Sequence, residues 1–137
     1  MEIIISQNQD TPNVSIMKLR GALDGSTYEF FIKEAEKLYD NGVRNLILDM
    51  SELTFLSSAG LGALHRIARI FRGENRSILE EGWAALRVMG NDRNSGFQKN
   101  IKLLKPNEKI QAVLDTVGFK AFFEIYTELQ SALESFQ

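Results

Sequence analysis

The pattern of hydrophobic and polar positions changes its period in the middle of the chain. Residues 45–50 contain the continuous apolar run Leu46–Leu48, and a run of this length is typical of a β-strand buried on both faces. From Leu61 to Phe71 the apolar residues recur at spacings of three and four, which indicates a helix with one buried stripe. The pattern therefore predicts three consecutive elements: a strand over 45–50, a connection over 51–56 and a helix over 57–71.

Strand-like and helix-like segments alternate through the rest of the chain. Strands are predicted over residues 2–6, 14–20, 101–104 and 121–126, and helices over 26–40, 106–117 and 127–136. The turn-rich segment 7–13 joins the first two strands, so we expect a hairpin near a sheet edge. Ser26 and Glu29 are spaced as a capping box at the start of the first helix. Alternating strands and helices indicate an α/β fold. We predict a mixed β-sheet packed with about four helices.

Residues 73–99 fit neither pattern well. The flanks of this segment are polar and rich in glycine. Its apolar content is one short stripe at helical spacing, formed by Leu79, Trp83 and Leu86. Long insertions of this kind tend to be functional or disordered. We interpret the segment as an insertion after the second helix, a short helix on a partly mobile excursion. The alternative is that residues 85–89 form the next strand and an extra loop follows it.

Length and composition place the chain among ordinary globular domains. A chain of 137 residues with 44% apolar and 25% charged residues suggests one domain over residues 1–137. A net charge of −2 gives no electrostatic reason to bind nucleic acid directly. No apolar run approaches the ~20 residues of a membrane span. The N-terminus lacks the pattern of a signal peptide. We expect a cytoplasmic protein.

Catalytic chemistry has little support in the sequence. The chain has no cysteine and a single histidine, His65, with no carboxylate at ligand spacing from it on the predicted helix. His65 lies seven residues after Ser58, about 10 Å along a helix, which is too far for a catalytic dyad. No Walker A loop is present. We therefore predict no enzyme, no catalytic residue, no cofactor and no metal site, and we expect His65 on the helix surface.

The serine pair Ser57–Ser58 is the main chemical feature of the sequence. A helix N-terminus offers unpaired N–H groups and the positive end of the helix dipole, so a phosphate attached there would be well accommodated. Gly60 and Gly62 lack side chains, which would let another protein approach the backbone closely. The plainer interpretation is a helix capped by serine, which is common in proteins.

Residues 49–62, with the sequence DMSELTFLSSAGLG, resemble the signature of STAS domains, the anti-sigma factor antagonists of bacteria. In that family a strand ends in Asp-x-Ser or similar. An aromatic, an aliphatic, Asp, Ser, a small residue, Gly and Leu then open a helix. The family's phosphoacceptor serine stands two residues before the glycine and falls on Ser58. The family's frequent Asp falls on Ser57, which removes a negative charge and makes Ser57 a possible second acceptor. The order of elements outside 73–99 also resembles a STAS domain.

The resemblance implies a phosphorylation switch. An unphosphorylated antagonist sequesters an anti-sigma factor that has serine kinase activity, phosphorylation at Ser58 releases it, and a serine phosphatase reverses the modification. The turn 21–24 resembles the one before the family's first helix, which makes Asp24 a candidate site residue; an ordinary turn carboxylate is the alternative. The expected partner-binding residues are Asp24, Ser57, Ala59, Gly60, Leu61 and Gly62. The second hypothesis is an unswitched STAS module, either a small-ligand binder or a regulatory subunit of a larger assembly such as a lipid transporter.

Overall fold

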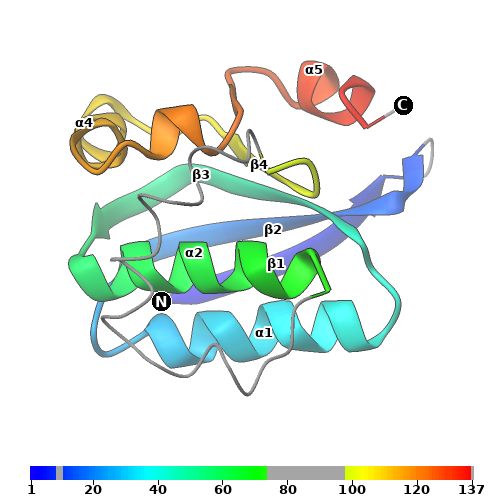
Figure 1. Ribbon diagram of the computed structural model, residues 1–137, viewed down its shortest axis with the longest axis horizontal. Helices are drawn as coiled ribbons and strands as arrows, with labels where there is room; N and C mark the ends of the chain where they lie inside the picture. The colour runs from blue at the N-terminus through cyan, green and yellow to red at the C-terminus, as the bar shows by residue number, and fades with distance from the viewer. Residues whose placement is uncertain (9–10, 74–97, 137) are drawn as a thin grey trace.

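The computed structural model describes residues 1–8, 11–73 and 98–136 (Figure 1). The strands are β1 (Glu2–Asn8), β2 (Thr11–Leu23), β3 (Asn45–Leu56), β4 (Ile101–Leu104) and β5 (Ile125–Tyr126). The helices are α1 (Tyr28–Asp40), α2 (Ser58–Phe71), α4 (Glu108–Thr116) and α5 (Leu129–Glu134), with the 3-10 turn η3 (Phe119–Ala121) after α4. The predicted α/β fold, a mixed sheet with four α-helices in the described part of the chain, is confirmed.

The five strands form one sheet in the order β1-β2-β3-β4-β5. β1 and β2 form the predicted antiparallel hairpin, and all other neighbours are parallel. β3 lies at the centre, and its run Leu46–Leu48 is fully buried, as predicted for a strand covered on both faces. Because β2 and β3 are parallel, their carboxyl ends meet at the same edge of the sheet, where α1 and α2 begin.

Each face of the sheet has its own hydrophobic cluster. On one face α1 and α2 lie side by side (Figure 1), and Ile110 and Leu114 of α4 join the same cluster. On the other face Ala132 and Leu133 of α5 pack against Ile47 of β3. The two-sided cover explains why the consecutive residues Leu46–Leu48 are all apolar. Among the described helices none is long and apolar enough to cross a membrane.

Strands β1, β2 and β3 are longer than the sequence pattern suggested, and the difference is largest for β2 and β3. The predicted connection 51–56 continues β3, and β2 continues to Leu23. Pairing persists because the register shifts twice, between Lys18 and Arg20 and between Gly21 and Ala22. Gly21 has φ +106°, a conformation that L side chains rarely adopt, so glycine is required at this irregularity. The period-two pattern is interrupted at such shifts, which is why the strand ends were predicted too early.

The last predicted strand is shorter than expected. Residues 119–121 form η3 and only Ile125–Tyr126 pairs with β4. Phe122 and Phe123 between them are buried in the core, where their rings stack edge to face with centroids 4.9 Å apart. The apolar run in this region therefore reflects core packing rather than strand pairing, a distinction that periodicity alone does not make.

The predicted insertion falls largely outside the described residues. Residues 74–97, with both interpretations of their secondary structure, are among those that are not described. Gln98, near the end of the segment, is 1% exposed. Its side chain accepts a hydrogen bond from Nε of Arg72 (2.9 Å) and donates one to the carbonyl of Ala68 (3.2 Å). Gln98 is thus part of the core beside the end of α2.

Candidate functional site

The two serines at the start of α2 have different structural roles. Ser57 is the N-cap: its backbone is extended (φ −92°, ψ 176°) and its Oγ accepts a hydrogen bond from the N–H of Gly60 at 3.3 Å. Ser58 is the first residue of the helix and is exposed. Its hydroxyl has no hydrogen-bond partner among the described residues. The cap thus occupies the Ser57 hydroxyl and leaves that of Ser58 accessible to another protein.

Gly60 brings the start of α2 against the end of β2. A Cβ atom at Gly60 would lie 2.6 Å from the carbonyl oxygen of Leu23, a distance that real Cβ atoms do not show. The same oxygen accepts a hydrogen bond from the N–H of Ser57 at 3.0 Å. Leu23 is also the register partner of Leu56 in the parallel pair β2–β3. These contacts place the turn at Asp24 next to the serine pair.

Asp24 is engaged within its own turn. Its Oδ1 accepts hydrogen bonds from the N–H and the hydroxyl of Ser26, at 2.9 and 2.7 Å. The Ser26 hydroxyl, followed by the Ser26 N–H, holds the pKa of the Asp24 carboxyl below its usual value. The predicted capping box is wrong, because α1 has Thr27 as its N-cap and the Ser26 hydroxyl bonds to Asp24 instead. The carboxylate orders the turn that α2 packs against.

The other predicted partner-binding residues fall into two groups. Gly60 and Leu61 are buried, and Ala59 is half-buried. A Cβ at Gly62 would meet no atom within 4 Å, so the helix surface there is open. Among the residues that sequence reasoning did not assign to the site is Phe55, which is 46% exposed. Its neighbours Leu53 and Leu56 are buried. Strict alternation would have placed Phe55 on the same side as Leu53, but the pairing register shifts between these two residues, so the sequence pattern alone did not place Phe55 outside.

His65 is buried, contrary to the prediction of a surface residue. Its ring packs against Phe122, with centroids 5.8 Å apart. The helix α2 lies among the sheet, α1 and the aromatic segment after α4, so its buried arc is wider than one stripe. In the described part of the chain no three His, Cys, Asp or Glu side chains are grouped as a metal site would require.

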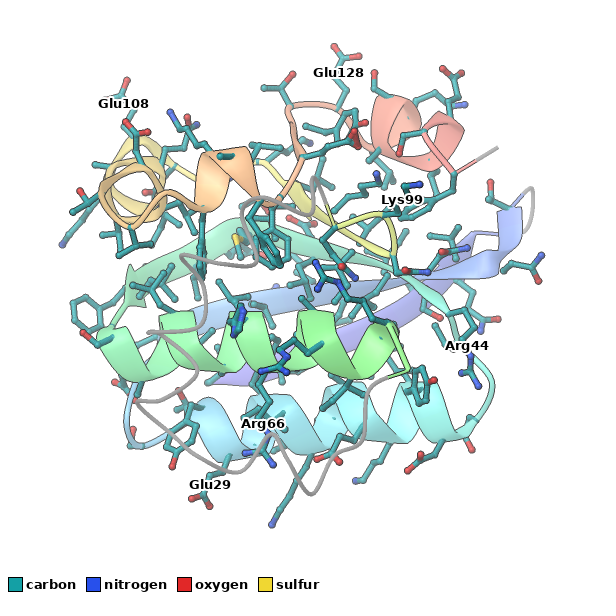
Figure 2. The ribbon with its side chains drawn as sticks, in the orientation of Figure 1. Glu29, Arg44, Arg66, Lys99, Glu108 and Glu128 are labelled. Atoms are coloured by element: carbon teal, nitrogen blue, oxygen red, sulfur yellow. The ribbon has the colours of Figure 1, made fainter. Side chains whose placement is uncertain are left out.

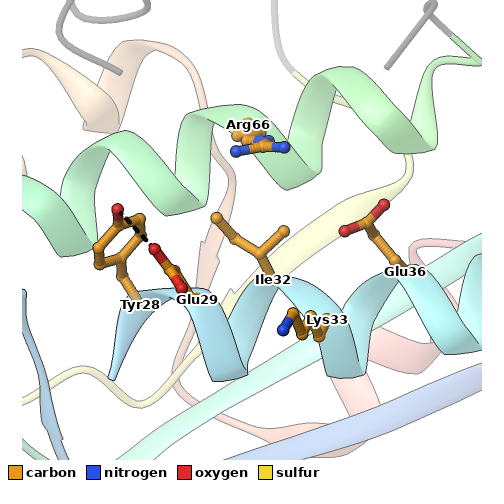
Figure 3. Close-up of a pocket in the computed structure, with 6 residues that line it drawn as sticks. All are labelled: Tyr28, Glu29, Ile32, Lys33, Glu36 and Arg66. Atoms are coloured by element: carbon orange, nitrogen blue, oxygen red, sulfur yellow. Dashed lines mark hydrogen bonds between the residues drawn. The ribbon is translucent and has the colours of Figure 1, made fainter. Parts of the chain in front are cut away.

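A hollow of about 310 Å³ opens between α1 and α2 (Figure 3). Arg66 lines it from α2, and Tyr28, Glu29, Ile32, Lys33 and Glu36 line it from α1. Figure 2 shows Arg66 extending from α2 toward α1. The Nε of Arg66 is buried without a hydrogen-bond partner in the described structure. An arginine in this position can bind a carboxylate through its planar guanidinium.

Comparison with known proteins agrees with this architecture. The profile of the STAS domain matches residues 6–79, more than half of the chain. No curated protein matches the chain in a sequence comparison.

Several solved structures share the fold at low sequence identity. Protein TM1081 of Thermotoga maritima is 19% identical, with a TM-score of 0.71, and the match covers 96% of this chain and 92% of that one. An anti-sigma factor antagonist from Mycobacterium paratuberculosis is 16% identical, with a TM-score of 0.69 and coverage of 98% and 92%. The phosphorylated form of SpoIIAA, a Bacillus cell fate determinant, is 16% identical, with a TM-score of 0.60 and coverage of 98% and 100%.

Proposed function

The chain belongs to the STAS domain family, and we propose that it is a cytoplasmic anti-sigma factor antagonist that phosphorylation of Ser58 switches off. The observation that carries the proposal is the division of roles in the serine pair. Ser57 uses its hydroxyl to cap α2, whereas the hydroxyl of Ser58 is exposed and makes no hydrogen bond in the described structure. A kinase needs a hydroxyl that can be reached and turned toward ATP. Ser58 meets that requirement without disturbing the helix.

The surroundings of Ser58 suit a phosphate. The first turn of α2 contains no acidic residue, and its N–H groups and dipole favour negative charge. A phosphate adds about −1.5 to −2 charges at neutral pH. The phosphorylated protein is therefore expected to keep its fold and to change mainly in its surface charge.

The charge change acts on a partner rather than on the chain itself. In the proposed cycle the unphosphorylated protein binds an anti-sigma factor that has serine kinase activity, which frees the sigma factor for transcription. The phosphate then faces acidic groups or the bound nucleotide of that partner, and a repulsion of about 1.4 kcal/mol already weakens binding tenfold. A serine phosphatase restores the binding form. SpoIIAA of Bacillus, an anti-sigma factor antagonist with this fold, exists in unphosphorylated and phosphorylated forms, which supports the proposal.

The accessible part of the site defines the proposed contact surface. Ser58 and Gly62 are open to a partner, and Ser57 and Ala59 are partly so. Gly60 and Leu61 are buried, so their role is to seat the helix rather than to touch a partner. Asp24 shapes the adjoining turn.

An unswitched STAS module, acting as a regulatory or ligand-binding subunit, is the second candidate. It is favoured by Ser57, which stands where the family often has an aspartate. In that case Ser58 would be an ordinary first residue of a helix, and no kinase would modify it.

Incubation with the anti-sigma factors of the source organism and ATP tests the first function. We expect one phosphate, which peptide mass spectrometry places on Ser58. Ser57→Ala is the matched control: it removes the cap, costs about 1 kcal/mol of stability and leaves the acceptor in place. Phosphate on Ser57 alone would refute the residue assignment. A partner that binds the protein but transfers no phosphate would favour the unswitched module.

Binding measurements test the electrostatic part of the switch. Ser58→Ala should bind the partner as the unmodified protein does and should resist release by ATP. Ser58→Asp should bind more weakly, although less so than the phosphoprotein, because it carries one charge on a shorter side chain. Calorimetry that finds equal affinity for Ser58→Asp and the unmodified protein would contradict charge repulsion as the mechanism.

A further inference from the structure

The outward side of α2 carries a row of residues with an unusual composition. Ser58, Gly62 and Arg66 are spaced by four, so each is adjacent to the next along the helix, and the row turns gradually around the helix. Ser58 is exposed, the surface at Gly62 is open and Arg66 extends toward α1 (Figure 2). The helix contains Arg66 and Arg69 but no aspartate or glutamate. An arginine beside an accessible helix backbone can pair with an acidic side chain of a partner.

Phe55 lies just before the start of this row in the chain. It stands three residues before Ser58 at the end of β3, and 46% of its surface is exposed. A large aromatic side chain in this position can supply much of the binding energy of an interface once a partner covers it. Phe30 on α1 is almost equally exposed, at 44%, but belongs to a different helix and lies outside the row.

The hollow beside Arg66 completes the surface. Its volume of about 310 Å³ can admit a side chain, and the Nε of Arg66 inside it has no hydrogen-bond partner in the described part of the chain (Figure 3). Lys33 adds a second positive charge, whereas Glu29 and Glu36 contribute negative ones. Glu29 accepts a hydrogen bond from the Tyr28 hydroxyl at 3.2 Å. The planar guanidinium of Arg66 is therefore the group best placed to select a carboxylate.

We propose that Phe55, Ser58, Gly62 and Arg66 form one docking strip for the anti-sigma factor. The partner covers Phe55 with an apolar pocket, approaches the helix backbone at Gly62 and places an aspartate or glutamate side chain on Arg66. The inference rests on the proposed function, since Ser58 lies inside the strip. A partner carboxylate on Arg66 would lie about 12 Å along the helix from a phosphate on Ser58, so its repulsion of the phosphate would be weak and screened by salt.

Each substitution in the strip has a matched control. Phe30 matches the exposure of Phe55, and Lys37 carries the same charge as Arg66. Binding to each purified anti-sigma factor of the source organism is measured by calorimetry, and circular dichroism verifies the fold. Phe55→Ala should weaken binding at least about tenfold, whereas Phe30→Ala should change it less than about twofold. Arg66→Gln should weaken binding about tenfold and flatten its salt dependence. Lys37→Gln, which removes a charge from exposed α1, should do neither.

The phosphorylated protein separates this inference from the proposed function. Arg66→Gln should weaken the unphosphorylated complex while Ser58 phosphate still lowers the affinity that remains. If phosphate releases the partner but Phe55→Ala and Arg66→Gln bind as their controls do, the strip is wrong and the switch stands. If no anti-sigma factor binds the unmodified protein, the proposed function fails, and the strip fails with it.

Discussion

Replacing Gly60 by alanine should destabilise the fold, and the same change at Gly62, in the same helix, should stabilise it. A methyl group on Gly60 would lie 2.6 Å from the carbonyl oxygen of Leu23 and 2.8 Å from Cδ1 of Leu56. Both distances are far inside van der Waals contact. The Leu23 oxygen is held in place, because it accepts the hydrogen bond from the N–H of Ser57.

The size of the effect follows from three contributions. Overpacking of a well-packed site costs about 1–3 kcal/mol, and a weakened hydrogen bond to Leu23 adds about 1 kcal/mol. Alanine regains about 1 kcal/mol over glycine as a helix former. Gly60→Ala should therefore lower the free energy of unfolding by about 1–3 kcal/mol. At Gly62 no atom lies within 4 Å of the new methyl group, so only the propensity gain of about 0.5–1 kcal/mol remains.

Urea unfolding followed by circular dichroism measures both variants. The midpoints should move in opposite directions with an unchanged slope, since neither substitution changes the surface exposed on unfolding. Equal stability of the two variants would refute the close packing of α2 on the end of β2. Phosphorylation by the partner kinase offers a further readout, because a displaced helix start should slow modification of Ser58 in Gly60→Ala.

Two further predictions concern the core and the second face of the sheet. Gln98→Ala should destabilise the protein by about 1–3 kcal/mol in thermal unfolding, because the Nε of Arg72 loses the Gln98 acceptor. Excision of residues 75–96 that keeps Gln98 should change stability by only about 1–2 kcal/mol. An unchanged stability of Gln98→Ala, or failure of the excised protein to fold, would contradict these expectations. The Lys102 ammonium and the Tyr126 hydroxyl both donate hydrogen bonds to the Glu124 carboxylate. The hydrogen bond from Lys102 is the main reason that the pKa of Glu124 is below its usual value. The stabilisation from the Lys102–Glu124 pair is present above the pKa of about 4.3 that Glu124 has in the unfolded chain. It is lost as the pH falls through the lower pKa that Glu124 has in the folded protein. Glu124→Gln should cost about 1–2 kcal/mol at pH 7, allowing for the 34% exposure of Glu124, and the difference from wild type should shrink in acid urea titrations.

The sequence was sufficient where the hydrophobic period was clean. Leu46–Leu48 identified the central strand, and the spacing in residues 61–71 identified α2. The ends of β2 and β3 were missed because register shifts interrupt the period of two while the backbone pairing continues. Phe122 and Phe123 resemble a strand in the sequence but fill the core beside η3. Packing between distant elements decides such cases, and a local pattern does not record it.

In the candidate site, too, the local features were predictable from the sequence and the packing between distant elements was not. A helix N-terminus at the serine pair was predictable from capping preferences. The burial of Gly60 and His65 depended on what packs against α2, namely Leu23 from β2 and Phe122 from the segment after α4. Both contacts cross long stretches of sequence. Gly60 therefore seats the helix, a role that the sequence alone could not separate from close approach by a partner.

The replacement of the family's frequent aspartate by Ser57 has a structural explanation that bears on the choice between the two functions. Aspartate and serine are both strong N-cap residues, because each offers a side-chain oxygen to the N–H three residues later. Ser57 makes this bond to Gly60, so the helix start is retained without the aspartate. The negative charge is lost, and a phosphate on Ser58 would meet less repulsion from its neighbour. The departure from the family pattern therefore preserves the geometry that a phosphorylation switch needs, and it weighs less toward an unswitched module than the sequence suggests.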